Sequence, residues 1–381
     1  MENLKNPLSI PRIRSNCNFW MMRTNSGAFY NEFVREGFLA IGWNAIYRAT
    51  LSQYKDDGLI SIISKHYPKE KQPRSPVNKC VKFIDVLSDG DIALIVGDGV
   101  ITFAMIKEYY EVSNDTTTIQ NEIVVDELIS KGLHKEEPIK CPYIKRRKIE
   151  IICTKQIFSL NPNLYKAYIL NRHSLSNLND YAEYILSACY DIYVYRNLAT
   201  ITFRANSVDR LKALDVSGFI YHATRLLCFE DEELITTKIY LSSPGDILFQ
   251  IENGIIFIES HWEFFVALAL ILFGGNMELA SFKIPIPSLK NMITEFCNRK
   301  RKKELMDLEM QEKRETVRGI KLDNDKKEFE LEKARELELE KIIESITESA
   351  RNIRIAAIDN KIIPYQTIVV QHDDKESPDN A

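Results

Sequence analysis

The clearest hydrophobic pattern in the chain is a pair of apolar runs, residues 92–96 and 100–106, on either side of Asp98-Gly99. Both runs are nearly continuous in apolar residues, which is typical of strands that are buried on both faces. An Asp-Gly pair between two such runs favours a tight β-hairpin, because glycine adopts the positive φ that the turn requires. The pattern therefore predicts a hairpin inside a closed or two-sided β core.

The segments around this hairpin predict the rest of a first domain, residues 1–155, which we expect to be a small β-barrel. Apolar residues at strand or helix spacing alternate there with turn residues. The expected elements are strands over 18–23, 38–43 and 143–153, helices over 29–36 and 51–67, and an exposed proline-containing loop over 68–79.

Residues 156–290 predict a second, α+β domain. Its apolar run 264–273 is too short for the roughly 20 residues of a membrane-spanning helix. It predicts a buried helix, with a surface-lying membrane element or a self-association face as the alternatives. The other expected elements are helices over 176–189 and after Ser207, strands 190–195 and 198–204 that meet at Arg196-Asn197, and a strand pair over 237–241 and 246–251.

Residues 291–360 predict a long helix in which acidic and basic residues are finely mixed. Late in this helix apolar residues recur at spacings of four and three, which indicates a short coiled-coil seam that docks on the protein or forms a homo-oligomer. The tail 361–381 is expected to be partly disordered. The predicted fold class is thus α+β and multidomain: an N-terminal β-barrel, a central α+β domain and a C-terminal long charged helix. The seam residues are Leu339, Ile343, Ile346, Ala350, Ile353 and Ala357.

Composition and charge exclude only a few classes of function. The 381 residues carry a formal net charge of −4, so any binding of nucleic acid must come from a local basic patch. The seven cysteines are scattered singly, which argues against a zinc knuckle and against a disulfide framework. The three histidines at 173, 222 and 261 lack a second ligand at metal-binding spacing. The polar start lacks an apolar signal core, so we expect a cytoplasmic protein.

Four short motifs resemble the opening domain of Mrr-type restriction proteins, which belongs to the PUA/EVE-like class of small β-barrels. The resemblance covers about residues 15–155. It implies a barrel that holds a nucleobase, often a modified one, in an aromatic-lined pocket. The motifs are Phe19-Trp20-x-x-Arg23, Phe38-Leu-Ala-Ile-Gly-Trp43, Asp89-Gly90-Asp91-Ile92 and the basic run that begins Lys145-Arg146-Arg147-Lys148.

Recognition of a base outside the stack requires flat apolar side chains and a few polar groups for the edge of the base. The alternative for the tryptophans is a place in the core, and for the basic run a solvated strand end. The candidate walls are Trp20, Tyr30, Phe38 and Trp43, the candidate edge-reading or phosphate-holding residues are Arg23, Asn25, Ser26 and Asn44, and the candidate phosphate contacts are Lys145, Arg146, Arg147 and Lys148.

A nuclease domain of the Mrr type would need metal-holding carboxylates close to a lysine. Asp231-Glu232-Glu233 with Lys238 has the wrong spacing, and Asp246 with Gln250 lacks the lysine. We therefore predict a non-catalytic protein that recognises nucleic acid, namely DNA with a possibly modified base, without a metal or another cofactor. The resemblance to Mrr-type proteins implies a role in bacterial defence against phage. The alternatives are a diverged metal-dependent DNA nuclease and an oligomerising or membrane-directed defence effector.

Overall fold

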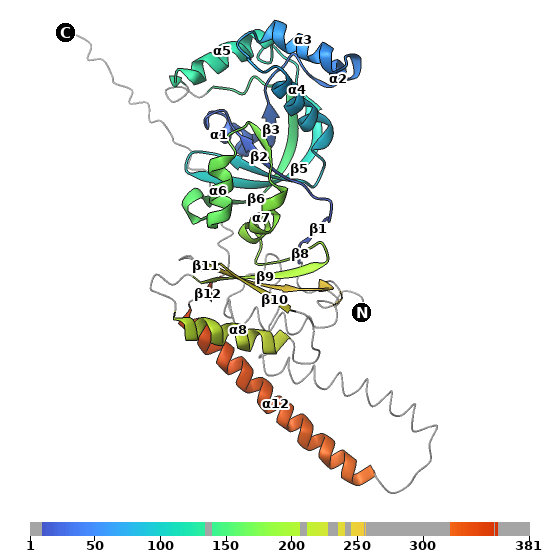
Figure 1. Ribbon diagram of the computed structural model, residues 1–381, viewed down its shortest axis with the longest axis vertical. Coiled ribbons are helices and arrows are strands. Elements are labelled where there is room, and N and C mark those ends of the chain that lie inside the picture. Colours follow the sequence, from blue (N-terminus) through green and yellow to red (C-terminus); the bar gives the residue numbers. More distant parts are fainter. Residues whose placement is uncertain are drawn as a thin grey trace, which may run out of the picture.

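The computed structural model describes residues 10–133, 139–205, 212–227, 235–240, 245–254, 256, 321–353 and 355–356. In these residues the protein is α+β and contains two mixed β-sheets (Figure 1). The first sheet curls into a half-barrel with the strand order β3-β6-β5-β4-β2-β7, in which only β2 and β4 run parallel. Its strands are β2 (Phe19–Arg23), β3 (Phe38–Ile41), β4 (Ile92–Val96), β5 (Val100–Glu111), β6 (Lys145–Gln156) and β7 (Leu175–Asn177).

The predicted hairpin is confirmed at the centre of this sheet. β4 and β5 pair antiparallel, the Gly97 N–H donates to the Val100 carbonyl at 2.9 Å, and Gly99 has a φ of 71°. All five residues of β4 are buried. Alternate side chains of β4 enter two different apolar clusters, so both faces of the sheet are covered as expected.

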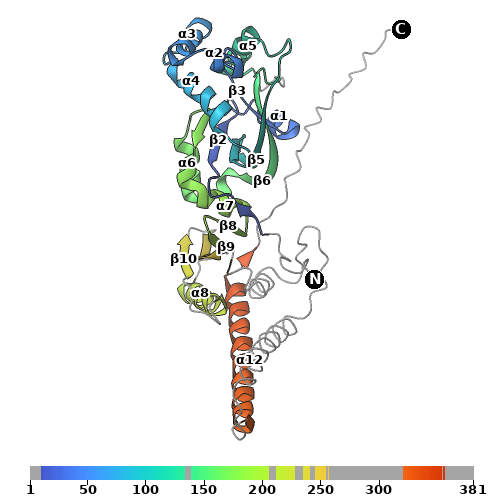
Figure 2. The same ribbon diagram turned by 90° about the vertical axis from the view of Figure 1, so that its right-hand side faces the viewer.

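Helices contribute to the packing on both faces of the half-barrel, and α2, α3, α4 and α5 lie at the end shown uppermost in Figures 1 and 2. On one face the clustered residues come from α1 and α5, and on the other from α6 and α7. The helices at the end share a third small cluster. The bounds are α1 (Tyr30–Glu36), α2 (Arg48–Gln53), α3 (Asp56–His66), α4 (Arg74–Val81), α5 (Ile119–Ser130), α6 (Pro162–Leu170) and α7 (Ala182–Cys189).

Two local predictions in this region were wrong. The helix expected over 51–67 is two helices, α2 and α3, and the loop expected over 68–79 contains most of α4. Pro73 is the N-cap of α4 and Pro76 lies in its first turn, where no backbone N–H is needed for the helix. Proline at these positions is compatible with the start of a helix, and Pro76 and Val77 lie on the buried face of α4.

The first sheet extends beyond residue 155, where we expected the first domain to end. β7 pairs antiparallel with β2, with Trp20 opposite Asn177, so 175–177 is an edge strand and not the start of a helix. In return, β1 (Arg12–Ile13) pairs with β8 (Ile192–Tyr195) of the second sheet. The two parts of the chain therefore exchange strands.

The second sheet confirms the two expected strand pairs. β8 and β9 (Leu198–Ala205) meet at Arg196 and Asn197, whose φ values of 50° and 65° fit a tight hairpin turn. β10 (Ile235–Tyr240) and β11 (Gly245–Ile251) also pair antiparallel. β12 (Ile355–Ala356) adds to β9.

The long charged helix α12 (Lys321–Asn352) packs its late apolar residues on α8 (Ala213–Leu227) and the second sheet. The apolar seam up to Ile353 therefore docks on its own chain, and Ala357 lies outside the described residues. The earlier turns of α12 extend away as a rod (Figures 1 and 2). The buried residues of the helix are Leu339, Ile342, Ile346 and Ala350, followed by Ile353.

Several expectations fall outside the described residues. These are the apolar run 264–273, the helical part from 291 to 320 and the tail 361–381. Of the helices that are described, none combines the length and the apolar character needed to cross a bilayer.

Candidate binding cleft

A cleft of about 780 Å³ opens where the ends of β2 and β3 approach each other. These strands hold the fifth and first places in the sheet order, so the curl of the sheet brings them together. α5 and the segment that follows α6 complete the cleft. Its polar and aromatic lining comprises Arg23, Asn25, Ser26, Trp43, Tyr67, Glu70, Glu122, Asp126, Tyr143, Tyr168, Arg172 and Ser174.

The segment 42–44 after β3 is held from both sides by buried charges. Glu122 accepts hydrogen bonds from the backbone N–H groups of Trp43 and Asn44, and the Lys145 ammonium donates to the Trp43 carbonyl at 2.9 Å. Both charged residues are at most 1% exposed. A Cβ at Gly42 would lie 2.8 Å from Glu122 Oε1, so only glycine fits there. The indole of Trp43 is thus presented at the cleft by a rigid backbone.

Backbone strain gathers at the same place. Trp43 has a φ of 59°, and Asn25 and Ser26, in the turn after β2, have φ values of 49° and 58°. Asparagine tolerates this left-handed region, but for a bulky residue such as tryptophan it is an outlier. Strain of this kind persists where the surrounding structure enforces it, and it is frequent at binding sites. Three residues with positive φ around one cleft, including the outlier Trp43, mark it as the candidate site.

Asp126 supplies an open acceptor in the cleft. Its Oδ1 accepts from Asn25 Nδ2 at 2.9 Å and from the Tyr143 hydroxyl at 3.2 Å, whereas Oδ2 has no hydrogen bond within the described residues. The side chain faces the cleft and keeps exposed surface, yet the walls around it remove enough water to raise its pKa to about 6. Repulsion from Glu122 and Glu70 adds to this rise in pKa. Asp126 can therefore accept a proton or a hydrogen bond from a ligand near neutral pH.

The remaining polar side chains of the cleft differ in whether they already bind other groups of the protein. The Arg23 guanidinium lies 4.7 Å from the centre of the Tyr168 ring and donates to the Asn171 carbonyl, so it braces the end of α6. Arg172 is exposed, and its side chain has no hydrogen bond or ion pair in the described structure. The Ser174 hydroxyl is buried without a hydrogen-bond partner in the described part of the chain. These last two groups are available to a ligand.

The structure brings together four of the eight expected base-binding residues: Arg23, Asn25, Ser26 and Trp43. Asn44 lies directly behind the cleft, where its buried side chain bonds to the backbone of Thr117, Pro142 and Ile144. Tyr30 is outside the cleft, with its ring against Gly97.

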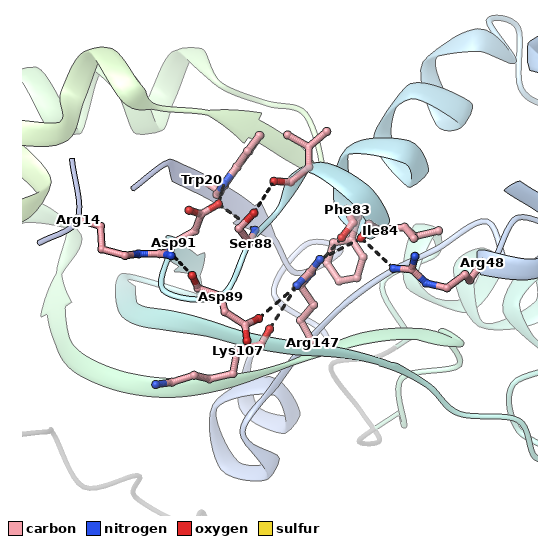
Figure 3. A network of polar contacts seen from close by, with 11 residues as sticks. Arg14, Trp20, Arg48, Phe83, Ile84, Ser88, Asp89, Asp91, Lys107 and Arg147 are labelled. Atoms are coloured by element: carbon pink, nitrogen blue, oxygen red, sulfur yellow. Dashed lines mark hydrogen bonds and ion pairs between the residues drawn. The ribbon is translucent and has the colours of Figure 1, made fainter. Parts of the chain in front are cut away.

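The expectation that Trp20 and Phe38 form walls is corrected by the structure. Trp20 is 3% exposed, and its indole N–H donates to Asp91 Oδ2 at 3.0 Å (Figure 3). Phe38 is 2% exposed and packs against Phe33. Both rings belong to the core, which was the alternative for the tryptophans.

The expected phosphate site at 145–148 is also corrected. Lys145 is buried behind Trp43, and Arg146 donates to the carbonyls of Cys141 and Tyr143. Arg147 donates to the carbonyls of Phe83, Ile84 and Lys107 (Figure 3). Lys148 is exposed and forms an ion pair with Glu108. The run therefore stabilises the fold and does not form a free basic patch.

Sequence reasoning missed the acids of the cleft, although a signal was present. Glu122 and Asp126 are four residues apart on α5, so they share one helix face. Tyr67, Tyr143 and Tyr168 come from three separate segments, and nothing local in the sequence joins them.

No protein-family model, no curated protein and no solved structure matches this chain. Among the described side chains, no group of three or more histidine, cysteine, aspartate and glutamate residues is placed to hold a metal ion.

Proposed function

We propose that the cleft binds a single nucleobase and that the protein recognises nucleic acid, specifically DNA, through this base without cleaving it. The observation that supports the proposal is that Trp43 and Asp126 line the same cleft. Trp43 contributes a flat ring on a strained backbone, and Asp126 contributes a carboxylate oxygen that lacks a partner in the described structure. A base needs a stacking surface and a hydrogen-bond partner for its edge. The volume of about 780 Å³ suits a nucleoside-sized ligand.

The acidic character of the cleft favours particular bases. A carboxylate accepts from the exocyclic amino group of cytosine, whereas thymine presents a carbonyl oxygen at the same position. Adenine carries an amino donor as well as cytosine, and of the two we propose cytosine, with 5-methylcytosine as the modified form, as the ligand. The resemblance to PUA/EVE-like domains of Mrr-type proteins supports this choice and a role in defence against foreign DNA.

Two nucleosides test the proposal directly. 5-Methyl-2′-deoxycytidine and thymidine both carry a 5-methyl group, and their ring edges differ in hydrogen bonding. By isothermal titration calorimetry we expect the methylcytidine to bind about tenfold more tightly, because one charged hydrogen bond contributes roughly 1.5–3 kcal/mol. Equal affinities, or no binding of either nucleoside, would contradict the proposal.

The matched variants are Asp126→Asn and Glu127→Gln. The amide introduced by Asp126→Asn would keep one carbonyl acceptor but lose the charge, so we expect about fivefold weaker binding of the methylcytidine. Glu127 is the next residue on α5, and its carboxylate pairs with Lys69 outside the cleft, so its replacement should leave the affinity unchanged.

Binding should also depend on pH. Because burial raises the pKa of Asp126 to about 6, its carboxylate takes up a proton as the pH falls through that value. A proton then competes with the amino group of the base, so the affinity for 5-methyl-2′-deoxycytidine should fall about fivefold from pH 7.5 to pH 5. Glu122 and Glu70 face the same carboxylate, and burial also raises the pKa of Glu122. The Asp126→Asn variant therefore decides the assignment: its pH profile should be flatter, and an unchanged profile would exclude Asp126.

A further inference from the structure

A second hollow, of about 610 Å³, lies on α4 and the start of β7. Among the residues that line it are three cationic side chains and a histidine, and no aspartate or glutamate. The lining of the cleft differs, because it contains three carboxylates together with Arg23 and Arg172. The basic lining residues of this hollow, which we call the basic groove, are Arg74, Lys79, Lys82 and His173.

The basic groove adjoins the cleft at two points. The Lys79 ammonium lies 5.2 Å from the centre of the Trp43 ring, so one residue of the groove touches the candidate stacking surface. In the segment 172–175, which leads into β7, Arg172 and Ser174 line the cleft while His173 and Leu175 line the groove. The two hollows therefore border on the same segment.

The cations of the groove are available. Arg74 and Lys82 are exposed, and neither side chain has a hydrogen bond or an ion pair with the described residues. This distinguishes them from 145–148, where backbone carbonyls and an acid occupy the basic groups. Lys79 is partly buried, and this burial lowers the pKa of its ammonium, although the nearby Glu70 opposes the shift.

We propose that the basic groove binds the sugar-phosphate backbone of the strand whose base occupies the cleft. This inference rests on the proposed function and extends it from a base to a polynucleotide. The cleft lining mixes three carboxylates with Arg23 and Arg172, whereas the adjoining groove has cationic side chains and no carboxylate, so the groove is the surface better suited to neutralise the charge of the strand. Each neutralised phosphate of a single strand contributes about 0.7 to the slope of log affinity against log salt.

The test uses the full chain and a fluorescein-labelled ten-nucleotide DNA strand with one central 5-methylcytosine. Fluorescence anisotropy at several salt concentrations is measured for the native protein and for the Arg74→Gln/Lys82→Gln variant. We expect the variant to bind at least tenfold more weakly at low salt, with a salt slope reduced by about 1.4, which corresponds to two phosphate contacts. Its affinity for free 5-methyl-2′-deoxycytidine should not change.

The control is Lys107→Gln/Lys148→Gln, which removes the same net charge from two lysines that are paired with acids on another surface. It should leave both the affinity and the slope close to native. If both double variants weaken binding equally, net charge and not the groove is responsible, and the proposal is overturned. It is also overturned if the groove variant binds the strand like the native protein.

A strand with an abasic central site separates the two proposals. If nucleosides do not bind but the groove variant weakens binding of the abasic strand, the groove is supported and the base-binding proposal fails. If the native protein binds neither strand, both proposals fail.

Discussion

Replacing Asp91 by alanine is expected to lower the free energy of unfolding by about 3 kcal/mol, because one buried and two partly buried donors would lose their acceptor at once. Asp91 is fully buried between the starts of β2 and β4. Its Oδ1 accepts from the Asn18 N–H at 3.0 Å. Its Oδ2 accepts from the Trp20 indole at 3.0 Å and from the Ser88 N–H at 3.1 Å (Figure 3). Urea denaturation at neutral pH, followed by circular dichroism, measures the loss.

Asp89 provides the matched control two residues away. Its side chain is 68% exposed, and its carboxylate lies 3.9 Å from Arg147. Only Asp89 is exposed in this pair, and its distance of 3.9 Å from the buried Arg147 is long for an ion pair. Such a contact contributes roughly 0–1 kcal/mol, so Asp89→Ala should change the free energy of unfolding by less than about 1 kcal/mol. Similar losses for the two variants would mean that the buried hydrogen bonds of Asp91 are not what holds these strands together.

Replacing Trp43 by alanine is expected to weaken binding of 5-methyl-2′-deoxycytidine about thirtyfold. Stacking of a base on an aromatic side chain contributes roughly 1–3 kcal/mol, and Trp43 is the strained aromatic residue at the cleft. Titration calorimetry of the Ala and Phe variants gives the measurement, and phenylalanine should recover part of the affinity. If the alanine variant bound like the native protein, the stacking surface would have to be sought elsewhere.

A second substitution at Trp43 distinguishes the loss of ligand stacking from the backbone strain at this residue. Alanine keeps the φ of 59°, which disfavours residues with a Cβ, whereas glycine adopts it freely. Trp43→Gly should therefore have a free energy of unfolding about 1 kcal/mol higher than that of Trp43→Ala, and it should unfold at a higher urea concentration. Both variants lose the stacking surface. Equal stability would show that the backbone at residue 43 is not strained.

The sequence specifies the local parts of this fold well. The Asp98-Gly99 and Arg196-Asn197 hairpins were predicted because a turn and its two strands are neighbours in the chain. The pairing of β7 with β2 was not predicted, because its partner lies more than a hundred residues earlier and three residues carry little pattern. The pairing of β1 with β8 could not be predicted from local sequence patterns for the same reason.

Strand geometry could have improved the prediction for the basic run 145–148. Successive residues of a strand point to opposite faces, so four consecutive basic residues cannot form one patch. In β6 the side chains of Lys145 and Arg147 point into the protein and bond to carbonyls. For Trp20 and Trp43 no such rule exists: both fall in short apolar segments, and only the tertiary structure places one in the core and the other at the cleft.

The pairing of β1 with β8 and of β7 with β2 limits how far the chain can fold during its synthesis. The N-terminal segment leaves the ribosome first, but its strand partner in β8 is made only after the whole half-barrel. β2 likewise keeps one unpaired edge until 175–177 has emerged. An unpaired edge of this kind is a template for pairing with other chains, so a nascent chain stalled before residue 175 should be the aggregation-prone species of this protein.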